Sequence, residues 1–199
     1  MQAETLAAAY RLWRRNWRGK GREYTAGALV WQVKNFNSNL LHDWQLLPFS
    51  VFAQLNDCWP VTSWALVDYF LRPKPAYYAV ARELRSFTIG MTRQDKQTFA
   101  NDRSAADFII EAVLEVWGTN STLVDKTATL EVTFFDLESD WMDKWEKEVV
   151  LVANSSTELY KGHVTGQPIR KKQSDVPKVI IISARILDGQ TVLGRYSNW

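Results

Sequence analysis

The chain has 199 residues, of which 46% are hydrophobic, and a formal net charge of +2. This length allows one large or two small globular domains, and the charge is too small for a nucleic-acid-binding surface. The single cysteine, Cys58, excludes an internal disulfide framework, and the two histidines, His42 and His163, form no zinc motif, so we expect no metal and no other cofactor. We find no apolar run of membrane-spanning length and no signal-peptide pattern, so we expect no membrane contact.

Residues 2–18 have the pattern of an amphipathic helix. Leu6, Tyr10, Trp13 and Trp17 recur at intervals of three and four residues and share one stripe. The flanks of this stripe carry basic residues, namely Arg11, Arg14, Arg15 and Arg18. We expect these arginines to form a solvated helix face rather than a nucleic-acid-binding patch.

Thr25–Gln32 is a short and almost uninterrupted apolar run, which predicts a strand buried on both faces, as in a parallel sheet. A second helix is predicted after Arg72-Pro73-Lys74-Pro75, with prolines in its first turn and Tyr77, Val80, Ala81 and Leu84 on one face. A helix, a buried strand and a helix in this order indicate an α/β fold.

The stretch Val33–Gln54 shows no sustained hydrophobic period. It would be a long loop in the middle of a compact unit. Such loops are uncommon in compact domains, so its length is evidence against interpreting this stretch as an ordinary loop.

Beyond Gly90 the pattern changes to that of an all-β domain. We expect a polar linker at Thr92–Ser104 and a domain boundary within Arg85–Thr98. Strands follow at Phe108–Trp117, Ala128–Phe135, Glu148–Val152, Thr157–Lys161, Val179–Leu187 and Thr191–Tyr196, the last two joined by a hairpin turn at Asp188-Gly189. Short strands at this spacing predict an antiparallel, immunoglobulin-like β-sandwich.

The stretch Gln54–Tyr78 combines aromatic side chains with an amide and carboxylates. Rings such as Trp59, Trp64 and Tyr69 suit sugars, whose faces carry C–H groups and whose edges carry hydroxyls. The same residues also fit a buried aromatic cluster between two domains.

The strings GALVWQ and LNDCWPVTSWALVDYFLRPKPAYYAVARELR resemble the C-terminal part of glycoside hydrolase family 2 β-mannosidases, in particular the fungal intracellular type B enzymes. The resemblance implies an α/β plus all-β fold: residues 1–90 would be the last αβα portion of a TIM (β/α)8 barrel, and residues 91–199 an immunoglobulin-like β-sandwich. In the family a further domain follows, which we expect to be missing from this chain.

The resemblance also implies where the substrate lies. Trp31 matches the tryptophan that closes barrel strand eight, beneath the non-reducing mannose, and Asn56, Asp57 and Trp59 match the loop that follows. For Trp64 and Tyr69 we expect a structural role. The two catalytic glutamates of the family lie on barrel strands four and seven, before the first residue of this chain, so we expect no catalytic residue here and no activity from the chain alone.

Joining Gln32 directly to Leu55 restores the family string WQLND. Val codons begin with GT and Gln can be encoded by CAG, the two ends of a spliced intron. Our hypothesis is that Val33–Gln54 is a retained intron translated in frame, and the alternative is a functional loop.

Two further functions remain open: a non-catalytic β-sandwich module that binds carbohydrate or a protein partner, and another family 2 activity such as a β-galactosidase or β-glucuronidase. For the β-mannosidase reading, the expected partners are β-mannoside oligosaccharides or glycan fragments, with no nucleic acid. The type B resemblance implies a cytoplasmic location. The sequons at Asn120 and Asn154 are then chance matches.

Overall fold

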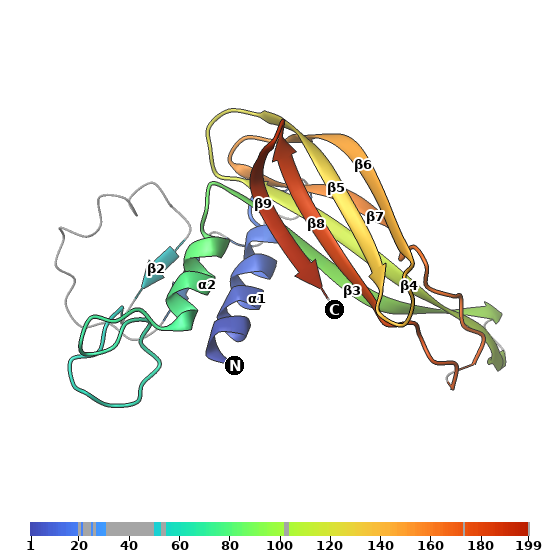
Figure 1. Cartoon of the computed structure of the whole chain (residues 1–199), viewed down its shortest axis with the longest axis horizontal. Helices are drawn as coiled ribbons and strands as arrows, with labels where there is room; N and C mark the ends of the chain where they lie inside the picture. The colour runs from blue at the N-terminus through green and yellow to red at the C-terminus, as the bar shows by residue number, and fades with distance from the viewer. Residues whose placement is uncertain are drawn as a thin grey trace.

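The computed structural model describes residues 1–19, 21, 25, 27–30, 50–52, 55–101, 104–172 and 174–198. The chain has two parts (Figure 1). The first, up to residue 86, contains the helices and is called the helical front part; the second, from residue 87, is a β-sandwich. Neither helix in these ranges is long and apolar enough to cross a membrane.

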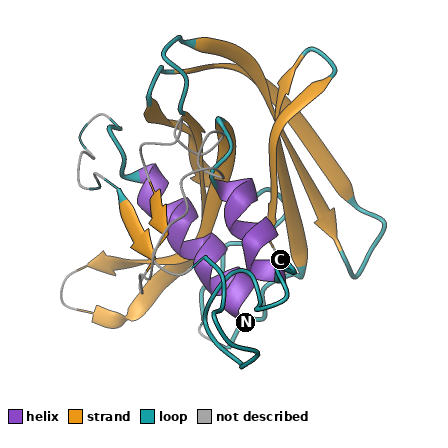
Figure 2. Cartoon of the chain, turned by 90° about the vertical axis from the view of Figure 1, so that its left-hand side faces the viewer, coloured by secondary structure: helices purple, strands orange, loops and turns teal. Residues whose placement is uncertain are grey.

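Two helices pack together in the front part (Figure 2). Helix α1 spans Gln2–Arg15 and helix α2 spans Pro75–Glu83, which confirms both predicted helices, although α1 ends three residues early. Pro75 occupies the first turn of α2, where its missing N–H costs nothing. Their shared core contains Tyr10, Trp17, Leu66, Ala76, Val80 and Leu84. Trp13, which we expected on the same stripe, is exposed.

A parallel pair of short strands accompanies the helices. Strand β1, Ala28–Val30, confirms the predicted strand and pairs in parallel with β2, Ser50–Phe52. The prediction of a structureless Val33–Gln54 is therefore wrong for β2, whose three residues gain order from a partner distant in sequence. Trp31 and residues 32–49 lie outside the described residues.

The sandwich has two antiparallel sheets, as predicted for an immunoglobulin-like domain. One sheet has the order β3-β4-β7 and the other the order β6-β5-β8-β9. The strands are β3 Phe87–Asn101, β4 Ser104–Asn120, β5 Lys126–Asp136, β6 Met142–Leu151, β7 Ser155–His163, β8 Ile180–Asp188 and β9 Thr191–Asn198. The predicted hairpin is present, with Gly189 at a positive φ of 57°.

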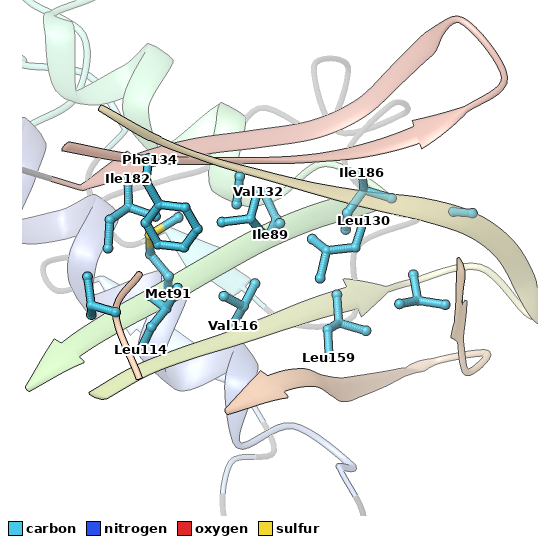
Figure 3. Close-up of a cluster of buried hydrophobic side chains, with 14 of the residues drawn as sticks. Ile89, Met91, Leu114, Val116, Leu130, Val132, Phe134, Leu159, Ile182 and Ile186 are labelled. Carbon is cyan, nitrogen blue, oxygen red and sulfur yellow. The ribbon is translucent and has the colours of Figure 1, made fainter. Parts of the chain in front are cut away.

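The space between the two sheets is filled by alternating apolar side chains (Figure 3). On β5, Leu130, Val132 and Phe134 point inward at every second residue and are fully buried. Across the sheet they pair with residues of β8: Leu130 with Ile186, and Phe134 with Ile182. Each buried side chain of this size stabilises the fold by about 1.5–3 kcal/mol.

The predicted polar linker Thr92–Ser104 is wrong. Most of it belongs to β3, which pairs with β4 from Phe87 opposite Asn120 as far as Phe99 opposite Phe108. The domain boundary expected at residue 90 falls inside this strand. The outer half of β3 carries exposed polar side chains, so the sequence has a linker composition although the backbone is paired.

The prediction of a solvated arginine face on α1 is also wrong. Arg11, Arg14 and Arg15 are buried, Arg14 with only 2% of its surface exposed, and Arg18 alone is exposed. Arg14 donates hydrogen bonds to the backbone carbonyls of Glu83 and Arg85 and to the Ser121 hydroxyl, which fastens α1 to both α2 and the sandwich. Burial lowers the pKa of Arg14 to about 10, and the nearby Glu83 charge opposes this effect only in part.

Arg15 and Arg11 complete this junction, which we call the arginine seam. Arg15 Nη2 lies 2.8 Å from Glu115 Oε2 and 2.7 Å from Glu158 Oε2, while its guanidinium stacks on the Trp117 ring. Arg11 Nη2 lies 2.6 Å from Glu83 Oε1, and its guanidinium covers the Tyr196 ring. These partners are distant in sequence, so helix periodicity could not predict them.

Gly90 permits the close approach of α1 to the sandwich. A Cβ atom at this position would lie 2.5 Å from the Trp117 ring and 2.7 Å from Arg11 Cγ. Both distances are shorter than carbon atoms tolerate, so the seam requires glycine here.

Candidate functional site

The candidate site is the segment that follows β2, residues 55–74, and Asp57 is its anchor. The Asp57 carboxylate is 3% exposed, accepts a hydrogen bond from the Ser63 hydroxyl, and lies 3.1 Å from Lys74 Nζ. Lys74 Nζ also donates to the Ser63 carbonyl at 3.2 Å. All three groups are thereby held together, so Asp57 shapes the segment rather than presenting a free carboxylate to a ligand.

Backbone hydrogen bonds draw the two ends of the segment together. The Asp57 N–H donates to the Val67 carbonyl at 3.0 Å, and the Val67 N–H donates to the Leu55 carbonyl at 2.8 Å. The Lys74 N–H donates to the Leu66 carbonyl at 2.8 Å, immediately before α2 begins. The segment is therefore fixed to the start of α2, and the residues between its ends project outward.

Asn56 stands at the beginning of this projection. Its side chain is exposed, and within the described residues that side chain makes one hydrogen bond, from Nδ2 to the Asp57 carbonyl at 3.3 Å. The amide oxygen and the second N–H remain on the surface, where they can exchange hydrogen bonds with sugar hydroxyls.

The aromatic side chains of the segment face solvent. Trp59 is 72% exposed and Trp64 is 59% exposed, and Tyr69 is also exposed. The hypothesis of a buried aromatic cluster is therefore wrong for these three rings. Sequence reasoning missed Phe70 and Tyr78, which are exposed as well; their direct adjacency to Tyr69 and Tyr77 was the available signal.

The predicted substrate residues occupy different environments. Asn56 and Trp59 are both exposed, whereas Asp57, between them in the sequence, is buried. Trp31 lies outside the described residues, but it directly follows the last residue of β1, Val30. The segment containing Asn56 follows the carboxyl end of β2, which runs parallel to β1.

Four described carboxyl groups have a lowered pKa, namely those of Asp68, Glu115, Glu131 and Asp136. For Asp68 the main cause is the hydrogen bond from the Arg72 backbone N–H. The described residues also contain no group of three or more side chains that could hold a metal ion. This arrangement can bind a polar ligand against aromatic rings.

Comparison with known families matches the sandwich. Residues 112–199 match the family described as a Mannosidase Ig/CBM-like domain. Over the whole chain, the sequence is 37% identical to β-mannosidase B from Thermothelomyces thermophilus and 32% identical to β-mannosidase B from Aspergillus flavus. The chain spans 21% and 20% of these two proteins, about a fifth of each.

Two solved structures share the fold. A β-D-mannosidase from Dictyoglomus thermophilum superposes with a TM-score of 0.51 and 23% identity, over 76% of this chain and 16% of that protein. The exo-chitosanase CsxA from Amycolatopsis orientalis superposes with a TM-score of 0.52 and 14% identity, over 100% of this chain and 18% of that protein.

Proposed function

This chain belongs to the β-mannosidase family of glycoside hydrolase family 2, and we propose that it supplies the mannose-facing edge and the following sandwich of a retaining β-mannosidase. The whole enzyme would remove terminal β-D-mannose residues from the non-reducing ends of β-mannosides. The observation that carries the proposal is the exposure of Asn56 and Trp59 in a segment that buried Asp57 anchors through Ser63 and Lys74, just before α2.

We propose that the helical front part is the last αβα portion of a TIM barrel. The succession of α1, β1 and α2 along the chain, with β2 between β1 and α2, and the packing of α1 on α2 support this assignment. In TIM barrels substrates bind at the carboxyl ends of the strands. Trp31, directly after β1, would then lie beneath the sugar ring, and Asn56 would exchange hydrogen bonds with its hydroxyls.

The proposed chemistry needs two carboxyl groups about 5–5.5 Å apart, one as nucleophile and one as acid and base. The strongly buried carboxylates that the structure describes are committed to cations: Asp57 to Lys74, Glu83 to Arg11, and Glu131 to Arg185 and Lys144. A carboxyl group whose pKa is lowered, such as that of Glu131, is ionised near neutral pH and cannot protonate a leaving group. We therefore propose that the catalytic glutamates lie outside this chain and that the chain alone does not hydrolyse mannosides.

The alternative function is a non-catalytic carbohydrate-binding module, which the Ig/CBM-like family description favours. The outer face of the β3-β4-β7 sheet has a cavity of about 390 Å³, bordered by charged groups such as Glu111, Lys161 and His163. No phenylalanine, tyrosine or tryptophan is among the described residues that line it. Carbohydrate-binding surfaces usually stack sugar rings on aromatic side chains. The cavity on this sheet lacks such side chains, so we favour the enzyme, whose proposed site includes Trp59, over the module.

Hydrolysis of an aryl β-mannoside separates the two functions. The chain would be assayed alone and joined behind the preceding part of the Thermothelomyces relative, with that preceding part alone as the control. We expect activity only from the joined protein. Hydrolysis by the chain alone, or a folded joined protein without activity, would contradict the proposal. If the chain bound to mannan, and neither the chain alone nor the joined protein hydrolysed the aryl β-mannoside, the carbohydrate-binding module would be favoured.

We also propose a cytoplasmic location, by analogy with the type B relatives. The packing of Asn120 supports it, since this sequon asparagine is fully buried and its Nδ2 donates to the carbonyls of Val124 and Leu151. A glycan on Nδ2 would break both hydrogen bonds. Immunofluorescence of the tagged whole protein tests the location. We expect cytoplasmic staining, and staining of the secretory pathway would contradict the proposal.

A further inference from the structure

A cavity of about 600 Å³ lies between the helices and the edge of the sandwich, away from the segment around Trp59. One wall is formed by Glu4 of α1, by Arg82 and Glu83 at the end of α2, and by Arg85 after it. The other wall comes from the start of β3 and the end of β9, which runs beside α1 (Figure 1). A ligand here would touch both parts of the chain at once.

Three arginines line this cavity: Arg82, Arg85 and Arg195. Within the part of the chain that the structure describes, the guanidinium groups of Arg85 and Arg195 have no carboxylate within ion-pair distance. Arg82 Nε lies 3.6 Å from Glu83 Oε1, but that carboxylate is already held by Arg11 at 2.6 Å. The three arginines outnumber the two carboxylates that line the cavity, Glu4 and Glu83, so its lining keeps a net positive charge.

The end of a helix normally repels anions, because its last carbonyl groups point outward. In this cavity Arg14 Nη1 donates to the carbonyl of Glu83, the last residue of α2, and to that of Arg85, two residues later. The buried Arg14 guanidinium thus removes the usual obstacle and adds further positive charge behind the wall.

The remaining lining groups indicate what else the ligand carries. The carboxylate of Glu4 and the hydroxyl of Ser197 border the same cavity. Carboxylates accept hydrogen bonds from hydroxyl groups, whereas they repel a bare anion. The size suits a small molecule rather than a single ion.

We propose that this cavity binds a small hydroxylated molecule through its phosphate or carboxylate group, with Arg85 and Arg195 holding the oxyanion and Glu4 accepting hydrogen bonds from its hydroxyls. Guanidinium groups pair with such oxyanions through two parallel hydrogen bonds. Because the walls belong to α2 and β9, the bound molecule joins the helical front part to the sandwich. Binding therefore raises the stability of the junction.

The test is isothermal titration calorimetry of the whole chain with inorganic phosphate, glycerol phosphate and glycerate, each against chloride at equal ionic strength. We expect glycerol phosphate or glycerate to bind more tightly than inorganic phosphate, and the stronger of the two identifies the oxyanion. Substitutions R85Q and R195Q should each weaken binding at least about tenfold, the value of one charge-assisted hydrogen-bond pair. K171Q removes an exposed positive charge outside the cavity and should leave binding unchanged.

E4Q provides a test that leaves the arginines intact. It removes the negative charge beside the oxyanion, so inorganic phosphate should bind about two- to threefold more tightly to this variant. Circular dichroism would show that each variant is folded, which we expect because Arg85 and Arg195 are exposed and make no ion pair within the described residues. Binding that is no stronger than with chloride, or that is equal in wild type and the R85Q/R195Q double variant, would overturn the proposal.

Discussion

The two parts of the chain close their cores in different ways. The sandwich buries one continuous core, and its members come from β3 to β8 together with Val164, the residue after β7. The helical front part has a smaller core around Tyr10 and Leu84, beside a parallel sheet of only two described strands. Parallel sheets are normally covered on both faces, so this sheet depends on further packing.

The difference shows how each part obtains its stability. The sandwich needs only its own alternating apolar strands, whereas the front part is held to it by the charged groups of the arginine seam. The front part also leaves large rings such as Trp59 and Trp64 exposed. A folded support on one side and an incomplete, aromatic surface on the other suit a part that completes a larger enzyme.

The largest expected effect comes from the sandwich core. Replacing fully buried Phe134 by alanine should cost about 3–5 kcal/mol of unfolding free energy, and this loss should unfold the whole chain, because the front part relies on the sandwich. Leu84→Ala, in the smaller core, should release the helices while the sandwich amides stay protected. Hydrogen exchange measured by mass spectrometry distinguishes these results.

Val176→Ala is the matched control for both substitutions, since this exposed side chain contributes no core packing. If L84A opened the sandwich amides as widely as F134A does, the two cores would form a single cooperative unit and the comparison would fail.

The next effect concerns the arginine seam. Arg15→Met keeps most of the aliphatic length but leaves the carboxylates of Glu115 and Glu158 without their shared cation. We expect a loss of about 1–3 kcal/mol, between the values for buried and exposed ion pairs. Lys161→Met removes an exposed cation from the same Glu115 and should cost less than about 1 kcal/mol. Urea denaturation of both variants gives the comparison, and equal losses would show that the seam does not support the front part.

The pH dependence of stability should follow Glu115. Hydrogen bonds from Lys161 and then Arg15 lower the pKa of this carboxyl group from its ordinary value of 4.5 to about 2. A lowered folded-state pKa gives stability that is present above pH 4.5 and is lost as the pH falls toward 2. Because solvent screens this partly exposed group, we expect its ionisation to contribute about 1–2 kcal/mol to the unfolding free energy. In E115Q the unfolding free energy should fall less steeply over this pH range, and an unchanged slope would contradict the assignment.

The smallest expected effect is that of deleting Val33–Gln54. If this stretch is a retained intron, the shortened chain should unfold at the same or a higher urea concentration, because Gln32 then joins Leu55 without strain. The result against the hypothesis is a clear loss of stability, since β2 pairs with β1 along Ser50–Phe52. Sequencing the mature transcript gives an independent answer: a message that still encodes the stretch would end the intron hypothesis.

Local patterns predicted the elements whose stability is local. The alternation along β5 and the turn at Asp188-Gly189 led to the sandwich, and the prolines before α2 led to its start. The outer half of β3 was missed because its order comes from pairing with β4 and its side chains face water. The role of Arg15 was missed because its carboxylate partners lie a hundred or more residues away.

The candidate site was predicted in part, through resemblance more than through pattern. Asn56 and Trp59 are exposed as a ligand-binding role requires, whereas Asp57 is an anchor whose partners, Ser63 and Lys74, no local rule would select. The exposure of Trp64 could not be predicted, because a tryptophan in a sequence fits a core and a binding surface equally well.

The most direct measurement is the kinetics of W31A and W59A in the joined protein with an aryl β-mannoside. Loss of a ring that stacks on the sugar should lower kcat/KM about 10- to 100-fold for W31A, with a smaller decrease for W59A at the exposed edge. Y78A, which removes an exposed ring from α2, should leave kcat/KM unchanged. If W31A retained full kcat/KM in a folded protein, the proposed sugar site after β1 would be wrong.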